Sequence, residues 1–247
     1  MNSSAIALLV FGCSFGAALI GMLLHSKLPE HHLDAAATDV IKLVMGLIAT
    51  MAALVLGLLV ASASGTYNAQ SSELQSVSAN VILLDRLLGS YGPEAKEARD
   101  QARDAIAAAH DRIWSSSGVQ ATNLGAATRF IQQLQNLAPK TDAQRLLQSQ
   151  AMQVAESLVR TRLLMFEQRG GLTSSIFLVV LAFWICVLFL GFGLFARFNA
   201  TVTVALLVGA LSVSGAIFLM LELGEPYRGL MRLSDAPLRD ALAQIDR

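Results

Sequence analysis

Four long apolar runs constrain this chain more than any other feature of its sequence. They cover residues 4–24, 41–62, 172–196 and 202–223. Each is about as long as the 20 or so residues that a helix needs to cross the hydrocarbon core of a membrane. Because lipid offers no partner to a free backbone amide, each run is expected to be one continuous helix. The sequence therefore predicts an all-α integral membrane protein with four transmembrane helices.

The charged residues are distributed unevenly around these runs. They make up only 15% of the 247 residues, against roughly 25% in a soluble protein, and most of them lie between the second and third runs. We therefore expect four parts: transmembrane helices 1 and 2 in residues 1–64, a helical region in 65–171, transmembrane helices 3 and 4 in 172–223, and a tail in 224–247. The net charge is zero and no basic stripe is present, so no nucleic-acid partner is expected.

The basic residues near the ends of the spans predict how the chain is oriented. Four spans place both termini and the region 65–171 on the same side of the membrane. Six arginines lie near span ends on that side, whereas the other side has three basic residues: Arg160, Arg162, Arg169, Arg228, Arg232 and Arg239 against Lys27, Lys42 and Arg197. Because basic residues favour the cytoplasmic side, we expect a multi-pass protein of the inner (cytoplasmic) membrane with both termini and the long segment in the cytoplasm.

The long segment has apolar residues at helical spacing. Leu74, Val77, Val81, Leu84 and Leu88 follow one another by three or four, which predicts that the second span continues as one long helix. The sequence Tyr91-Gly92-Pro93 should end it. Further helices are expected at 94–114, around 130–137 and from Thr141 onward, where Thr141 and Gln144 resemble a capping box. We expect the apolar stripes at 74–88 and 147–165 to pack against each other and against neighbouring copies, which predicts a homo-oligomer.

Sequence signatures of catalysis are lacking. The chain has no glycine-rich phosphate loop, no nucleophile elbow and no spacing of histidine and cysteine that is typical of a metal site. We therefore expect that the protein is not an enzyme and that it needs no cofactor.

The second span has one narrow face of small and polar residues. Its members follow one another by three or four: Lys42, Gly46, Thr50, Ala53, Gly57, Ala61 and Ser64. Small residues allow the backbones of two membrane helices to approach closely, and they also suit a helix that lines a narrow pore. Both interpretations are open from the sequence. If the helix lines a pore, Leu54 and Leu58 could form a hydrophobic gate.

Several short motifs resemble the bestrophin-like membrane family of bacteria. They are Glu225-Pro226-Tyr227-Arg228-Gly229-Leu230 and Ser234-Asp235-Ala236-Pro237-Leu238 in the tail, with Leu83-Leu84-Asp85-Arg86 and Tyr91-Gly92-Pro93-Glu94 before them. The tail motif, with Glu225, Pro226, Tyr227, Gly229, Asp235 and Pro237, is also distantly similar to that of true bestrophins. The resemblance implies four spans, a helical cytoplasmic part and a pentameric channel whose pore is lined by the second span.

Two departures from true bestrophins have consequences. The second span has no aromatic residue, whereas a bestrophin neck is aromatic. The bestrophin calcium clasp uses a run of acidic residues, of which only Asp235 and Asp240 remain in this chain. The resemblance therefore does not imply gating by calcium.

The leading hypothesis is an oligomeric, pentameric ion channel in contact with membrane lipid that passes an inorganic ion. Lys42 would lie at the outer mouth of the pore and favour anions. One alternative is a proton-driven, stator-like transport subunit, although no proline stands at the base of the third span and no acid lies within a span away from its end. The other alternative is a non-conducting scaffold or sensor that binds a partner through its cytoplasmic helices.

Overall fold

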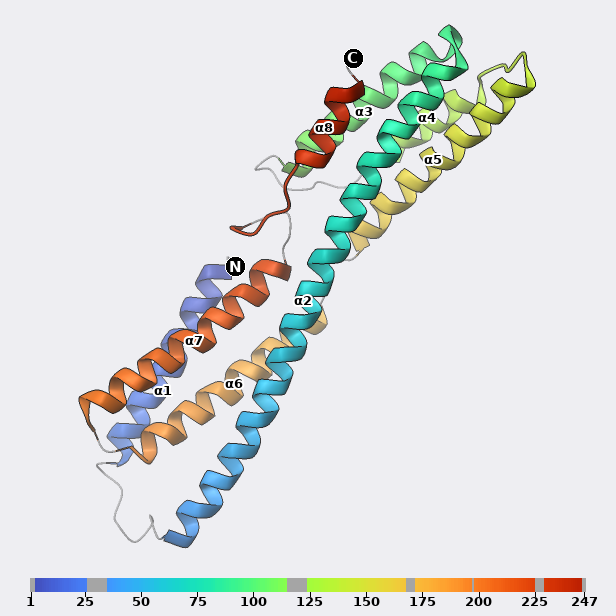
Figure 1. Cartoon of the computed structure of the whole chain (residues 1–247). Coiled ribbons are helices and arrows are strands. Elements are labelled where there is room, and N and C mark those ends of the chain that lie inside the picture. The colour runs from blue at the N-terminus through green and yellow to red at the C-terminus, as the bar shows by residue number, and fades with distance from the viewer. Residues whose placement is uncertain are drawn as a thin grey trace. The chain divides into compact units, whose positions relative to one another are not determined.

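The structure is a computed structural model that describes residues 3–25, 35–114, 124–167, 172–196, 198–224 and 229–245. These residues form helices and connecting segments and contain no strand (Figure 1). The helices are α1 (Ser3–His25), α2 (Ala35–Tyr91), the 3₁₀ helix η2 (Pro93–Ala95), α3 (Lys96–Trp114), α4 (Leu124–Gln135), α5 (Asp142–Glu167), α6 (Leu172–Leu194), α7 (Ala200–Gly224) and α8 (Ala236–Ile245). The all-α prediction is confirmed.

Among the described residues, four helices are long and apolar enough to cross a membrane. They are Ser3–His25, Thr38–Tyr91, Ile176–Leu194 and Ala200–Gly224, which coincide with the four apolar runs. The protein is therefore a multi-pass membrane protein. The second of these helices, α2, has 57 residues, far more than the 20 or so that cross the hydrocarbon core. Part of α2 must consequently lie outside the lipid, as the sequence predicts.

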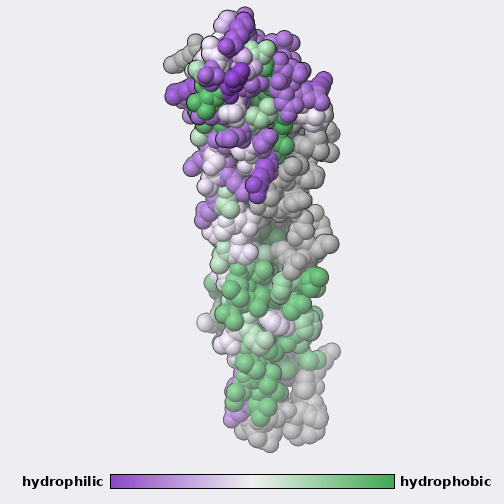
Figure 2. Space-filling view, turned by 90° about the vertical axis from the view of Figure 1, so that its right-hand side faces the viewer, coloured by the Kyte–Doolittle hydropathy of each residue, from purple (hydrophilic) through white to green (hydrophobic). Residues whose placement is uncertain are grey.

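The chain divides into two compact units. The membrane unit comprises Met1–Tyr67 and Gly171–Met231, and the polar unit comprises Asn68–Gly170 and Arg232–Arg247. Figure 2 shows that the visible surface of the membrane unit is mainly hydrophobic and that of the polar unit mainly hydrophilic. This contrast accounts for the uneven charge distribution in the sequence.

In the membrane unit, α1 packs against both α6 and α7 (Figure 1). Glycines allow the close approach of α1 and α6, because a Cβ at Gly21 would overlap the carbonyl oxygen of Leu190 and a Cβ at Gly193 would overlap that of Ala18. Against α7, the hydroxyl of Ser214 donates a 2.7 Å hydrogen bond to the carbonyl of Ala7. Small residues and an interhelical hydrogen bond thus hold these helices together, as is typical in membranes.

The polar unit has a core of its own. Leu84 and Leu88 of α2 are 2% exposed and Leu134 of α4 is fully buried, together with alanines of α3 and α5. Leu74 and Val81 are buried with apolar side chains of α8. Helices of the same chain therefore pack against the described side chains of the stripes at 74–88 and 147–165, whereas packing of these stripes against neighbouring copies stays a prediction. The apolar period alone could not show that α8 returns to α2.

The predicted end of α2 and start of α5 are confirmed, whereas α4 begins at Leu124 and ends at Gln135, before Leu137. Gly92 has φ 121°, which glycine adopts at little cost, and Pro93 opens η2. At the start of α5, Thr141 Oγ1 accepts the Gln144 amide N–H at 3.1 Å. The side-chain oxygen of Gln144 in turn accepts the amide N–H of Lys140 at 2.8 Å. The capping box is thus present, with its return bond displaced by one residue.

Candidate functional site

The small-and-polar face of α2, hereafter the small face, lies on the exposed side of the helix. It consists of Lys42, Gly46, Thr50, Ala53, Gly57 and Ala61, which are exposed, and Ser64, which is half-buried. On the opposite side of α2, Met45 and Ala52 are buried in the core of the membrane unit. The structure therefore brings the predicted site residues together on one surface, which points away from the core that α2 shares with its own chain.

Packing within the chain does not explain the small face. A Cβ added at Gly46 or at Gly57 would meet nothing within 4 Å, in contrast to the overlap at Gly21 and Gly193. Thr50 needs no outside partner, because its hydroxyl donates to the carbonyl of Leu47 at 2.8 Å. Close packing of these residues, if it occurs, must therefore involve another copy or another protein.

A second exposed surface, the leucine flank, runs along α2 beside the small face. It consists of Leu43, Leu47, Leu54 and Leu58, whose exposed fractions lie between 61% and 77%. Because successive helical residues are about 100° apart, Leu54 and Leu58 point sideways from Ala53 and Gly57. The two proposed gate residues thus lie beside the small face and not on it.

The N-terminal end of α2 bears opposite charges one turn apart. Asp39 and Lys42 are both exposed, and residues three apart on a helix are neighbours on its surface. The field of Lys42 at this end is therefore reduced by Asp39.

The tail motif begins beside a buried carboxylate. Glu225, Pro226 and Tyr227 lie outside the described residues, but Glu222 at the end of α7 is only 5% exposed. Its Oε2 accepts the amide N–H of Leu230 at 2.6 Å. Gly229 has φ 90°, and a Cβ there would overlap the Glu222 carboxylate. Gly229 is therefore required both for its backbone conformation and for space.

The second half of the tail motif begins α8. The carbonyl of Asp235 accepts the amide N–H of Leu238 at 3.1 Å and that of Arg239 at 3.0 Å, so Asp235 stands at the N-cap of the helix. Pro237 follows in the first turn, where its missing N–H costs nothing.

Two side chains of α3 hold this part of the tail within the polar unit. His110 Nε2 is 3.4 Å from Asp235 Oδ2, and Trp114 Nε1 donates to the carbonyl of Leu233 at 3.2 Å. The rings of His110 and Trp114 are stacked with their centroids 5.2 Å apart. The sequence analysis did not identify these contacts, because no local pattern connects residues more than a hundred positions apart.

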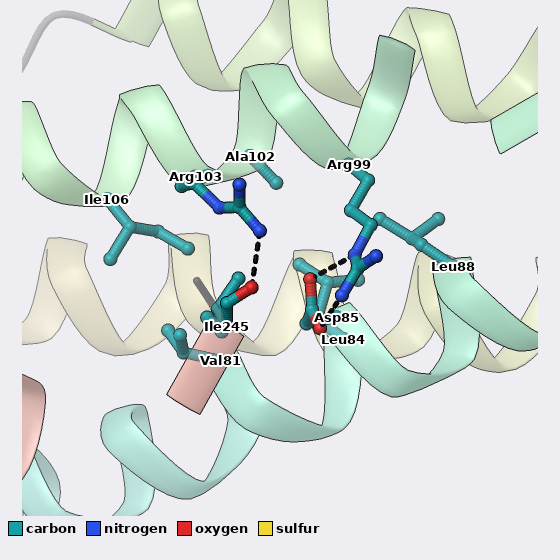
Figure 3. A pocket seen from close by; sticks show the side chains of 9 residues that line it. All are labelled: Val81, Leu84, Asp85, Leu88, Arg99, Ala102, Arg103, Ile106 and Ile245. Atoms are coloured by element: carbon teal, nitrogen blue, oxygen red, sulfur yellow. Dashed lines mark hydrogen bonds and ion pairs between the residues drawn. The ribbon is translucent and has the colours of Figure 1, made fainter. Parts of the chain in front are cut away.

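Charged contacts also join α2, α3 and α8 (Figure 3). Asp85, which belongs to a family motif, accepts two hydrogen bonds from the Arg99 guanidinium at 2.5 and 2.6 Å. This contact raises the pKa of Arg99 above its ordinary value. Arg103 donates to the carbonyl of Ile245 near the end of α8, where a positive charge is favourable.

These charged groups line a small pocket together with Val81, Leu84, Leu88, Ala102, Ile106 and Ile245. The charged groups bind one another or the backbone across the pocket (Figure 3), which indicates a structural role. In the described part of the chain, no group of three or more acidic, histidine or cysteine residues could hold a metal ion.

Comparison with known protein families identifies this chain's relatives. The model of the Bestrophin-like domain matches residues 12–238. No curated protein matches the chain, and no solved structure does.

Proposed function

The chain belongs to the bestrophin-like family, and from this premise we propose that it is a homo-oligomeric, pentameric ion channel whose pore is lined by the small face of α2. One observation carries the proposal: the small face is exposed, while the opposite side of the same helix is buried in the membrane unit. A surface of this composition along a span needs either a second helix or water beside it.

Lipid alone is a poor neighbour for the small face. Glycine and alanine offer little apolar area, and Lys42 favours an aqueous surrounding. The leucine flank is the part of α2 that suits lipid or an adjacent apolar helix. In a ring of copies, the leucine flank of each α2 contacts the neighbouring copy and the small faces turn toward the common axis.

The charges on α2 favour anions as the permeant ions. Five copies of Lys42 would form a positive ring at the outer entrance, which attracts inorganic anions, and Asp39 weakens that preference. The narrowest part lies near Ala53 and Gly57. A rotation of α2 by about a quarter turn would bring Leu54 and Leu58 toward the axis, where they would exclude water and close the pore.

The orientation follows from the arginine distribution. Both termini and the polar unit lie in the cytoplasm, and the membrane is the inner membrane. Reporter fusions after residue 120 and at the C-terminus measure this directly. A periplasmic signal from either fusion would overturn the orientation and place Lys42 at the inner end of the pore.

A cysteine scan of residues 42–64 tests the pore. Cys13 is exposed and Cys186 is half-buried, so both are first replaced. A membrane-impermeant thiol reagent should then block the current of reconstituted protein at positions 46, 50, 53 and 57. Cysteines at 45 and 52 are matched controls, because their side chains are buried within the chain and should not react.

The other outcomes distinguish the remaining functions. Block restricted to α6 or α7 would assign the pore to another helix. Assembled protein that never conducts would favour a scaffold or sensor and would make the small face a packing surface between copies. Current that requires a proton gradient and has no single-channel steps would favour the stator-like alternative.

The number of copies is tested by native mass spectrometry of detergent-solubilised protein. We expect a particle of five chains, and a monomer would exclude the channel. Replacing Leu47 and Leu54 of the leucine flank by glutamine should reduce the assembled fraction. Substitution of Leu84 is unsuitable for this purpose, because its side chain lies in the core of its own chain and its loss would disturb folding.

A further inference from the structure

We propose that the turn 229–231 after α7 is a lipid anchor, in which Leu230 and Met231 enter the membrane interface on the side where the fourth span ends. This surface goes beyond the proposed pore, which concerns α2 alone. Leu230 is 84% exposed and Met231 45%. Among the described residues, no other large hydrophobic side chain is as exposed as Leu230.

The exposure of Leu230 is built into the fold. A single exposed leucine is common at the surface of a soluble protein, and at a frayed chain end it would carry no meaning. Here the backbone is held at the start of the turn, because Gly229 has φ 90° and the amide N–H of Leu230 is bound by the buried Glu222 carboxylate at 2.6 Å. The buried carboxylate of Glu222 thus fixes the backbone at Leu230, whose apolar side chain is exposed.

The same hydrogen bond sets the depth of Leu230. Helix α7 has 25 residues, so at 1.5 Å per residue it is about 37 Å long, somewhat longer than the hydrocarbon core of about 30 Å. Its last turn, which includes Glu222, therefore lies near the membrane surface. The bond to Glu222 returns residue 230 to the level of that turn, which is the level of the lipid headgroups.

Two further features favour lipid as the occupant. The exposed apolar side chains of α7 continue to Leu219, which is 47% exposed and lies within one turn of Glu222, so apolar surface reaches the last turn of the helix. In the sequence, Leu230 and Met231 stand between Arg228 and Arg232. Apolar residues flanked by arginines suit a bilayer surface with anionic headgroups.

Nitroxide depth measurement tests the anchor. With Cys13 and Cys186 replaced, Leu230→Cys and Met231→Cys are labelled and reconstituted in vesicles of phosphatidylcholine and phosphatidylglycerol. Labels at both positions should collide with oxygen more than with a water-soluble nickel complex, at a depth of about 5–10 Å from the headgroup boundary. Ser234→Cys, at an exposed position, is the matched control and should report water.

Two results would overturn the anchor. A label at 230 that is as accessible to nickel as the label at 234 would place Leu230 in water. A label protected from both oxygen and nickel would place it against protein, in the same chain or in a second copy. The depth is tested separately by Gly229→Ala, which loses the positive φ and overlaps Glu222: the label at 230 should then move toward water, and an unchanged depth would refute the role of the turn. Neither measurement depends on conduction.

Discussion

The glycines of the spans allow one prediction that separates packing from pore lining. The change is Gly193→Ala on α6, compared with Gly57→Ala on α2. A Cβ at 193 would overlap the carbonyl oxygen of Ala18 and lie 2.9 Å from its carbonyl carbon and 3.1 Å from the amide nitrogen of Met22. These are backbone atoms of α1, which cannot change rotamer as a side chain could, so α1 and α6 must move apart.

The size of the effect follows from two opposing contributions. Overpacking in a well-packed core costs about 1–3 kcal/mol, whereas replacing a helical glycine by alanine contributes roughly 1 kcal/mol of helix propensity. Because the overlapping atoms belong to the backbone of α1, the upper end of the overpacking range applies, and Gly193→Ala should lower the free energy of unfolding by about 2 kcal/mol. At Gly57 no atom lies within 4 Å of the added Cβ, so the variant should be neutral or more stable by up to roughly 1 kcal/mol.

The assay is unfolding of the purified protein in mixed micelles by increasing dodecyl sulfate, followed by circular dichroism. Equal stability of Gly193→Ala and the parent protein would refute the close approach of α1 and α6. Loss of stability in Gly57→Ala as large as that in Gly193→Ala would show that the small face is tightly packed between copies. In that case water does not line it, and the proposed pore is wrong.

Three further predictions concern the polar unit. Asp85→Ala removes both hydrogen bonds to Arg99 and should lower the free energy of unfolding by about 1–2 kcal/mol, the range for a charged hydrogen bond reduced because the Arg99 side chain is 36% exposed. Trp114→Phe keeps the ring but loses the hydrogen bond to the backbone before α8, worth about 1 kcal/mol, and limited proteolysis should cut the tail sooner. The pKa of Glu94 is lowered from 4.5 by a backbone hydrogen bond and by Lys140. The contact of Glu94 with Lys140 therefore stabilises the fold above pH 4.5 and is lost as the pH falls through the lowered pKa; in Lys140→Ala, NMR titration should find a higher Glu94 pKa.

Controls and contrary outcomes follow from the same structure. The ion pair of Arg145 and Asp142 is 3.2 Å long, with side chains 71% and 98% exposed, so Arg145→Ala should change stability little. An effect of Arg145→Ala equal to that of Asp85→Ala would show that burial does not govern these pairs. If Trp114→Phe is cleaved at the same rate as the parent protein, the Trp114 hydrogen bond does not hold the tail. If the pKa of Glu94 is the same in Lys140→Ala as in the parent protein, Lys140 does not lower it.

Features with a local physical cause could be predicted from the sequence alone. The length and hydropathy of the apolar runs predict four spans, because the thickness of the bilayer sets the length of a spanning helix. The helical period of Leu74 to Leu88 predicts the extension of α2, and Gly92 and Pro93 predict its end, because backbone conformation depends on the residue itself. The tail motifs indicate the family, which the match over residues 12–238 shows.

Only the tertiary structure decided what each of these surfaces meets. Leu74, Leu84 and Leu88 of α2 have the period of an oligomer interface, yet helices of the same chain bury them. Gly57 and Gly193 are the same residue in similar apolar runs, but one faces open space and the other the backbone of α1. A sequence records which residues share a helix face and not which segment returns to cover it, because that choice depends on contacts between residues far apart in the chain. For the same reason, the contacts of Glu222 with Leu230 and of Asp235 with His110 became visible only in the fold.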